Sequence, residues 1–154
     1  ARSVFLGGIR NWDSLGGYGM PMKIFVSRPS KGLSGVESSI RSIVLNGKQP
    51  ANHINIMPVA SSGIVEQLVE DTPEGFAATG YASARKRNVR MLKVNGVAPC
   101  FENIVEKRYP LLRPLYLIVT KAVKPGVKQF VDFILSGEGQ QFISSQGVVS
   151  LSDM

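Results

Sequence analysis

The chain has 154 residues, of which 44% are hydrophobic and 19% are charged, so it can bury a core and lacks the composition of a disordered segment. Lys and Arg number 18 against 11 Asp and Glu, and the resulting net charge of +7 favours an anionic partner without identifying it. A single cysteine, Cys100, excludes an internal disulfide, and with His53 as the only histidine it cannot complete a Cys/His zinc site.

The first residue is Ala1, with neither an initiator methionine nor a leader before it, which indicates a processed protein or a piece of a longer one. The longest apolar run, Leu115 to Val119, is far shorter than the roughly 20 residues that a membrane-spanning helix needs. No internal repeat or linker interrupts the chain. We therefore expect one globular domain over residues 1–154.

The first predicted unit is a strand followed by a helix. Lys23 to Ser27 predicts a short buried strand between a Gly-rich loop and a proline turn. Ser34 is a suitable N-cap for the helix, and Asn46-Gly47 ends it. The helix is indicated by apolar residues at helical spacing: Val36, Ile40, Ile43 and Val44.

A second strand and helix follow. Asn55 to Val59 predicts the strand, Ser61-Ser62-Gly63 introduces the helix, and Thr72-Pro73 ends it. One broad face of this helix is apolar: Ile64, Val65, Leu68 and Val69.

Two further strands are predicted at Phe76 to Tyr81 and Val89 to Val94, with a turn at Asn95-Gly96 and a short helix from Glu102 to Lys107. The remaining elements lie in the last third of the chain.

Leu115 to Thr120 is predicted to be a fully buried strand. The strongest helical pattern follows Pro125: Val127, Phe130, Val131, Ile134 and Leu135. A further helix is predicted from Glu138 to Ser145. Strands that alternate with helices indicate an α/β fold, with a mixed, mostly parallel sheet flanked by helices.

The loop from Arg28 to Gly35, between the first strand and its helix, is the best candidate for chemistry. Free N–H groups of a first helical turn, the helix dipole and a hydroxyl at Ser34 would attract an oxyanion, and Arg28 could add a bidentate contact. Ser34 and Glu37 also fit a capping box, in which they satisfy the helix start and the carboxylate opposes an anion. The pattern leaves anion binding and structural capping both open.

Five segments in chain order carry a resemblance that covers nearly the whole chain. They are Val4–Gly17 (VFLGGIRNWDSLGG), Gly75–Tyr81 (GFAATGY), Val94–Ile104 (VNGVAPCFENI), Tyr109–Tyr116 (YPLLRPLY) and Phe130–Gln140 (FVDFILSGEGQ). Together they resemble periplasmic phosphate-binding proteins, the PstS-like substrate-binding subunits of ABC importers. The resemblance implies a type II periplasmic-binding-protein fold, in which two lobes close on an anion. This chain would supply the second lobe and the returning C-terminal segment, and the first lobe would be absent.

The resemblance also implies a ligand site. In that family the second lobe binds phosphate through a pattern like R-x-x-x-S-G-T, which Arg28 matches, with Ser34 in place of the threonine. Gly32 and Leu33 replace the family's serine and glycine, and Lys31 adds a peripheral charge. The expected ligand-binding residues are Arg28, Lys31, Gly32, Ser34, Gly35, Val36 and Tyr81. Tyr81 could equally belong to the core, where Trp12 is expected.

The function that the resemblance implies is capture of inorganic phosphate or a related tetrahedral oxyanion for an ABC uptake system. Its partners would be a membrane permease and either the missing first lobe or a second copy. It would work in the periplasm or on the extracellular face of the cytoplasmic membrane. No metal, cofactor or catalytic residue is expected, because the sequence has neither a phosphate-binding P-loop nor a nucleophile elbow. With half of the site missing, we expect weak, salt-sensitive binding.

An alternative is a sensory or interaction module that no longer takes part in transport. It would bind an anionic macromolecule or a protein partner, with nucleic acid the less favoured of these, through a basic cluster: Arg85, Lys86, Arg87 and Arg90.

Overall fold

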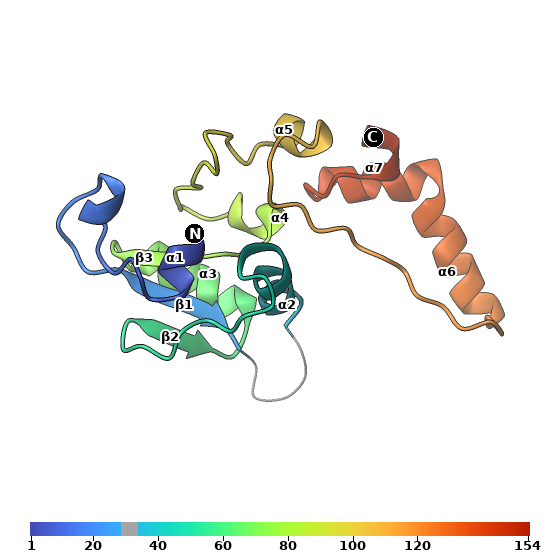
Figure 1. The fold of residues 1–154 in the computed structure, drawn as a ribbon. Helices are drawn as coiled ribbons and strands as arrows, with labels where there is room; N and C mark the ends of the chain where they lie inside the picture. The colour runs from blue at the N-terminus through green and yellow to red at the C-terminus, as the bar shows by residue number, and fades with distance from the viewer. Residues whose placement is uncertain (29–33) are drawn as a thin grey trace. The chain divides into compact units, whose positions relative to one another are not determined.

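The computed structural model describes residues 1–28 and 34–154, which form two compact units, Ala1–Arg90 and Met91–Met154. Figure 1 shows the sheet in the first unit and the last two helices of the chain in the second. Among the described residues, no helix has both the length and the apolar character needed to cross a membrane.

A three-stranded parallel sheet in the order β2-β1-β3 organises the first unit (Figure 1). The strands are β1 (Lys23–Ser27), β2 (Ile56–Val59) and β3 (Gly75–Ala77). In the register, Ile24 is opposite Ile56 on one side and Phe76 on the other. Parallel neighbours need a crossover, and helix α3 (Ser62–Asp71) supplies the one from β2 to β3. The predicted α/β class is confirmed.

Helix α2 (Gly35–Ser39) follows β1 and continues as a π-helix, η2 (Ile40–Val44). The sequence predicts this helix and its N-cap correctly, because the Ser34 side chain accepts a hydrogen bond from the Glu37 N–H. The π-helical second half was not predicted, since its apolar spacing is compatible with an ordinary helix.

The core lies on the sheet, and the alternation of β1 side chains explains how both faces are used. Ile24 and Val26 are buried with Phe5 from α1 (Arg2–Phe5) and with Ile40 from η2. Phe25 points to the other face, towards α3. Gly75 leaves no room for a side chain, because a Cβ there would lie 2.8 Å from the carbonyl oxygen of Thr72 and 3.2 Å from the Cα of Val69.

Trp12, which precedes the short helix η1 (Asp13–Leu15), packs the N-terminal segment against the sheet. Its indole N–H donates to the Glu74 carbonyl at 3.0 Å, and its ring meets Phe76 edge-on at 6.1 Å between centroids. Trp12, which was expected in the core, is partly buried and packs against the core cluster. A hydrogen bond from Lys23, 2.6 Å from the Glu74 carboxylate, lowers the pKa of Glu74.

Two strand predictions in the first half need correction. The strand predicted at Phe76 to Tyr81 ends at Ala77, and Tyr81 instead begins helix α4 (Tyr81–Ala84). No strand covers Val89 to Val94, where only an isolated bridge joins Val94 to Val97. The apolar residues of this second segment do not form a strand because no described strand lies beside them to pair with.

The second unit consists of helices α5 (Phe101–Val105), α6 (Pro125–Leu135) and α7 (Gly137–Ser145) and a last 3-10 turn, η3 (Leu151–Asp153). The three helices agree with the predicted ones. Helices α6 and α7 meet at a tight corner, where Ser136 caps α7 by accepting from the Gly139 N–H. Gln140 ties this corner together by donating to the Ile134 carbonyl and accepting from the Leu151 N–H, both at 2.6 Å.

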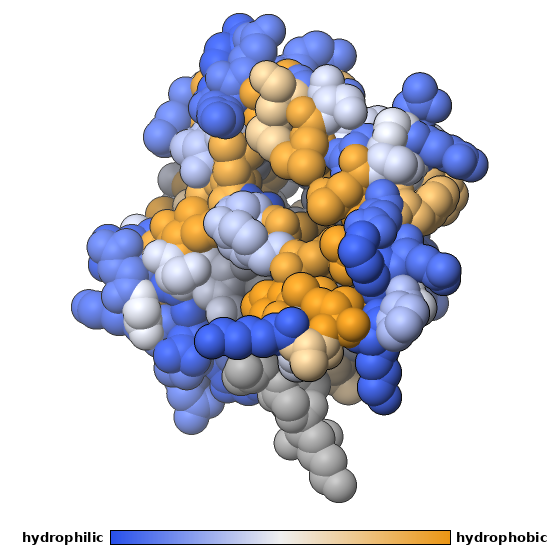
Figure 2. Space-filling model, turned by 90° about the vertical axis from the view of Figure 1, so that its right-hand side faces the viewer, coloured by the Kyte–Doolittle hydropathy of each residue, from blue (hydrophilic) through white to orange (hydrophobic). Residues whose placement is uncertain are grey.

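The prediction of a fully buried strand from Leu115 to Thr120 is wrong. The segment forms neither helix nor strand, and its apolar side chains are exposed, with Ile118 93% accessible. No hydrophobic residue from Met91 to Met154 is buried. Figure 2, seen from the side of α6, shows apolar side chains gathered on that face. The composition of the segment is that of a buried strand, but no described strand pairs with it.

Candidate functional site

The candidate site lies at the edge where the three parallel strands end, which is where open α/β sheets bind ligands. Arg28 directly follows β1, and its N–H donates to the Val59 carbonyl at 2.7 Å, so the ladder to β2 extends to this residue. Ser61 follows β2 and caps α3. Tyr81 follows β3 after a short turn. The sheet topology therefore brings the ends of all three strands to one edge.

A chain of polar contacts connects the end of β1 to the start of α2. Ser27 is buried, and its hydroxyl accepts a hydrogen bond from the Ser34 hydroxyl at 3.1 Å. The Ser34 oxygen in turn accepts from the Glu37 N–H at 3.2 Å. These contacts fix Ser34 beside the strand end, with the N–H groups of Gly35 and Val36 in the first turn of α2.

Arg28 forms an ion pair with a carboxylate of helix α2. Its Nε lies 3.6 Å from Glu37 Oε1, with side-chain exposures of 44% for Arg28 and 20% for Glu37. Among the described residues, the Glu37 carboxylate therefore pairs with Arg28 and does not close a capping box with the Ser34 N–H. Ser34 thus acts as the helix cap, while Glu37 sits beside the positive group of the site.

The structure thus brings Arg28 and Ser34 together, each in contact with Glu37. Tyr81 is half-buried on a separate element, and none of its described contacts joins it to Arg28 or Ser34. Lys31 and Gly32 lie outside the described residues. Sequence reasoning missed Ser27, because a serine that ends an apolar strand has no distinguishing pattern.

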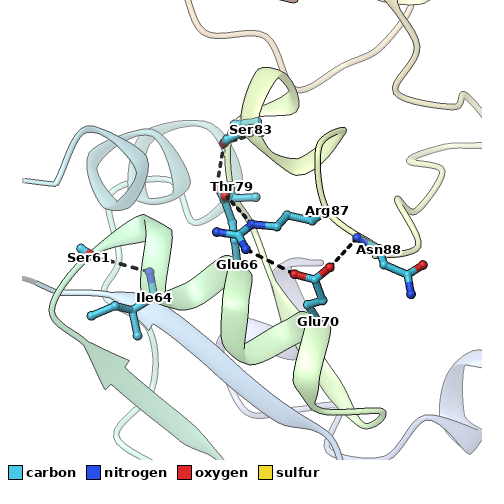
Figure 3. A network of polar contacts seen from close by, with 9 residues as sticks. Ser61, Ile64, Glu66, Glu70, Thr79, Ser83, Arg87 and Asn88 are labelled. Carbon is cyan, nitrogen blue, oxygen red and sulfur yellow. Dashed lines mark hydrogen bonds and ion pairs between the residues drawn. The ribbon is translucent and has the colours of Figure 1, made fainter.

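A second polar network surrounds Glu66 of α3 and is shown in Figure 3. The Glu66 carboxylate is 7% exposed and accepts hydrogen bonds from the Thr79 hydroxyl and, at 2.6 Å, from the Ser83 hydroxyl. Arg87 approaches it with Nε at 4.0 Å. Both hydroxyl donors flank Tyr81 in sequence, so this network fixes the turn that leads from β3 into α4. No local sequence pattern indicates this network, since its members are spread over four segments.

The basic cluster of the alternative reading is partly used inside the molecule. Arg87 lies 3.3 Å from the Glu70 carboxylate, which also accepts from the Asn88 N–H at 2.8 Å (Figure 3). Arg85, Lys86 and Arg90 are exposed. One of the four cationic side chains is thus committed to an intramolecular ion pair.

No group of three or more metal-ligating side chains occurs in the part of the chain that the structure describes. Cys100 is half-buried just before α5. A backbone hydrogen bond, assisted by one from the Cys100 thiol, lowers the pKa of Glu102.

Comparison with known proteins gives consistent similarities. Residues 2–138 match the protein family described as a PBP superfamily domain. The phosphate-binding protein PstS of Borreliella burgdorferi is 30% identical over 157 residues, which cover 96% of this chain and 55% of that protein. PstS of Bacillus subtilis is 28% identical over 155 residues, which cover 99% of this chain and 49% of that protein. The chain therefore spans about half the length of the curated relatives it matches.

Solved structures show the same similarity in three dimensions. A proposed phosphate ABC transporter substrate-binding protein from Clostridium perfringens, solved with bound phosphate, superposes with a TM-score of 0.83 at 26% identity. The match covers 97% of this chain and 60% of that one. An ABC-type phosphate transport receptor from Vibrio cholerae shares the fold, with a TM-score of 0.70 at 20% identity.

Proposed function

Because the chain belongs to the family of PBP superfamily domains, we propose that it binds inorganic phosphate or a related tetrahedral oxyanion at the junction of β1 and α2. The observation that carries the proposal is the placement of Arg28 and Ser34 at the carboxyl edge of the sheet. The guanidinium neutralises charge and the N–H groups of Gly35 and Val36 donate hydrogen bonds, while the Ser34 hydroxyl donates to the anion after its proton turns away from Ser27. Lys31, Gly32 and Tyr81 complete the proposed set.

Binding is reversible capture without a covalent step. The relatives are named as phosphate-binding proteins, and one solved relative is described as a substrate-binding protein of a phosphate ABC transporter. By analogy, the chain delivers its anion to a membrane permease, in the periplasm or on the extracellular face of the cytoplasmic membrane. The interaction-module alternative is less favoured, because Arg87 of its basic cluster is paired with Glu70.

Replacing Arg28 by glutamine is expected to weaken phosphate binding by at least about tenfold, because a hydrogen bond to a charged group contributes about 1.5–3 kcal/mol. The measurement is a phosphate titration of the isotope-labelled 154-residue chain at low ionic strength, followed by NMR at the N–H groups of Ser34, Gly35 and Val36. Half of a two-lobed site leaves part of the anion in water, so the expected Kd is about 1 mM or weaker and rises with salt.

The matched control is Lys48→Gln, which removes the same charge from an exposed position at the far end of the helical segment. Lys48→Gln should leave the phosphate Kd within about twofold of wild type. An unchanged Kd in Arg28→Gln, or equal weakening by both variants, would contradict the proposed site.

The partner proposed for the second unit is the half of the relatives that this chain does not span. Its exposed apolar segment, Leu115 to Val119, needs a sheet to pair with, and no hydrophobic residue of the unit is buried. Arg113 and Lys121 bracket the segment. In a symmetric pair of two such segments these cations would repel one another, so a different partner with an acidic sheet edge fits better than a second copy.

Replacing Ile118 by aspartate is expected to abolish this docking, because the charge would fall within the apolar surface that the partner must cover. The chain is mixed with the part of Borreliella burgdorferi PstS that it does not span, and the molar mass of the product is measured by light scattering. A 1:1 complex is expected for wild type. Ile54→Asp is the control, since Ile54 is equally exposed, at 94% against 93%, but lies outside the segment. Homodimers of wild type without a complex would refute the proposal.

A further inference from the structure

The segment from Arg85 to Lys93 is the most basic stretch of the chain. Its nine residues include five Lys and Arg and no Asp or Glu, whereas the whole chain has 18 cationic residues against 11 acidic ones. Cationic and anionic side chains are usually interspersed on the surface of a soluble domain. The concentration of one sign of charge in a short segment therefore indicates a contact with an anionic partner.

Contacts inside the first unit hold the start of this segment in place, as Figure 3 shows. Arg87 lies 3.3 Å from the Glu70 carboxylate, and the Asn88 N–H donates to the same carboxylate at 2.8 Å. Ser83, in the helix that leads into the segment, donates to Glu66 at 2.6 Å. Two carboxylates of α3 thus fix the turn through Ser83, Arg87 and Asn88, and they do not neutralise the neighbouring cations.

The other cationic side chains of the segment are open to an outside partner. Among the described residues they form no ion pair, and all four are exposed: Arg85, Lys86, Arg90 and Lys93. Like charges that lie close together along one backbone repel one another. A surface with many negative charges relieves this repulsion and attracts all four side chains at once.

Exposed apolar side chains occur in the same stretch of backbone. Met91 and Leu92 directly follow Arg90, and 39% and 40% of their surfaces are accessible. Consecutive Cα atoms are about 3.8 Å apart, so these residues stay beside the cations in any arrangement of the two units. Cations next to exposed apolar side chains fit the boundary between lipid headgroups and acyl chains. A nucleic acid would favour aromatic side chains that stack on bases, and residues 82–93 contain none.

We propose that residues 85–93 form a contact surface for membranes that contain anionic lipids. The lipid phosphates pair with the four cations, while Met91 and Leu92 enter the apolar boundary of the bilayer. The attraction extends over about one Debye length, roughly 8–10 Å in physiological salt. The surface uses none of the residues proposed for anion capture, so it holds the chain at a membrane without occupying the anion site.

The test is sedimentation of the 154-residue chain with vesicles, either of phosphatidylcholine alone or of an equimolar mixture with phosphatidylglycerol. Each cation near an anionic surface contributes about fivefold to the partition coefficient, so Arg85→Gln combined with Lys86→Gln should lower binding to the mixed vesicles about thirtyfold. The matched control is Arg2→Gln combined with Lys48→Gln, two exposed cations in or after elements that pack on the sheet face opposite α3. This control should change the partition coefficient by less than about threefold.

Two apolar variants distinguish a lipid surface from other causes of sedimentation. Met91→Gln keeps the length of the side chain and removes its apolar character, so it should lower binding to the mixed vesicles about fivefold. Ile118→Asn makes a similar change in the exposed segment Leu115 to Val119, and it should leave binding within about twofold of wild type.

Equal binding to both kinds of vesicle, or equal weakening by the two double variants, would overturn the proposal. Polyglutamate and single-stranded DNA are titrated in parallel. If either of them binds through Arg85 and Lys86 while the mixed vesicles do not bind, the partner is another polyanion and the proposal is wrong. Arg28→Gln should sediment like wild type, so a failure here leaves the proposed phosphate binding untouched, and the reverse also holds.

Discussion

Replacing Phe5 by alanine is expected to lower the free energy of unfolding by about 3–5 kcal/mol. The Phe5 side chain is fully buried and packs against the ring of Phe76, 5.4 Å away between centroids. It belongs to the same buried cluster as Ile24 of the central strand. The truncation therefore leaves a cavity between α1 and the sheet that close-packed neighbours can fill only in part. Urea unfolding followed by Trp12 fluorescence measures the loss.

Phe142→Ala is the control for the chemical change itself. Phe142 lies on α7 with 60% of its surface exposed, so its truncation should cost less than about 1 kcal/mol. If both variants lowered the free energy of unfolding by a similar amount, Phe5 would not be a core residue. A large loss for Phe142 alone would place the main core in the second unit.

Gly139→Ala is expected to destabilise the corner between α6 and α7 by about 3 kcal/mol. A Cβ at this position would overlap the Phe133 carbonyl oxygen and lie 2.9 Å from both the Cα and the carbonyl oxygen of Ile134. All three neighbours are backbone atoms, so relief requires the two helices to separate. Hydrogen exchange of the Gln140 amide, measured by NMR, reports the opening of this corner.

The matched substitution is Gly126→Ala in the first turn of α6, where no atom lies within 4 Å of the added Cβ. Alanine favours the helical state over glycine, so this variant should gain about 0.4–1 kcal/mol. The same substitution is thus expected to lower the stability of the chain at Gly139 and to raise it at Gly126. Faster exchange in both variants, or in neither, would contradict the geometry of the corner.

The first unit could be predicted from the sequence because its signals are local. The β1 strand, the Ser34 cap and α3 each follow from residues within one short window. The π-helical turn of η2 could not be predicted, since Ile40 and Val44 fit an ordinary helix equally well. The end of β3 at Ala77 was not predicted for a related reason, because the small residues that follow are compatible with a strand and with a turn.

The second unit shows where local pattern fails. The residues Leu115 to Val119 have the composition of a strand buried on both faces, and the prediction of burial required a pairing strand, which none of the described residues supplies. Hydrophobicity indicates that a segment favours burial, but it does not identify the surface that would bury it.

The candidate site was predicted in part. Arg28 and Ser34 were identified by residue type and by their place between strand and helix, and both lie at the sheet edge. The Glu37 carboxylate pairs with Arg28 and not with the helix start. This pairing depends on side-chain packing at a strand end, which the periodicity of apolar residues does not describe. The same holds for Glu66, whose hydroxyl partners come from segments 13 and 17 residues away.

The cations around the exposed apolar segment have a consequence for the handling of the chain. Five consecutive residues with strand propensity, low charge and no proline form the kind of window that nucleates cross-β stacking. Arg113 and Lys121 are each separated by one residue from an end of this segment, where charge opposes in-register stacking of identical segments. Because that protection is electrostatic, added salt screens it. We therefore expect the isolated chain to be more soluble in dilute buffer than at high ionic strength.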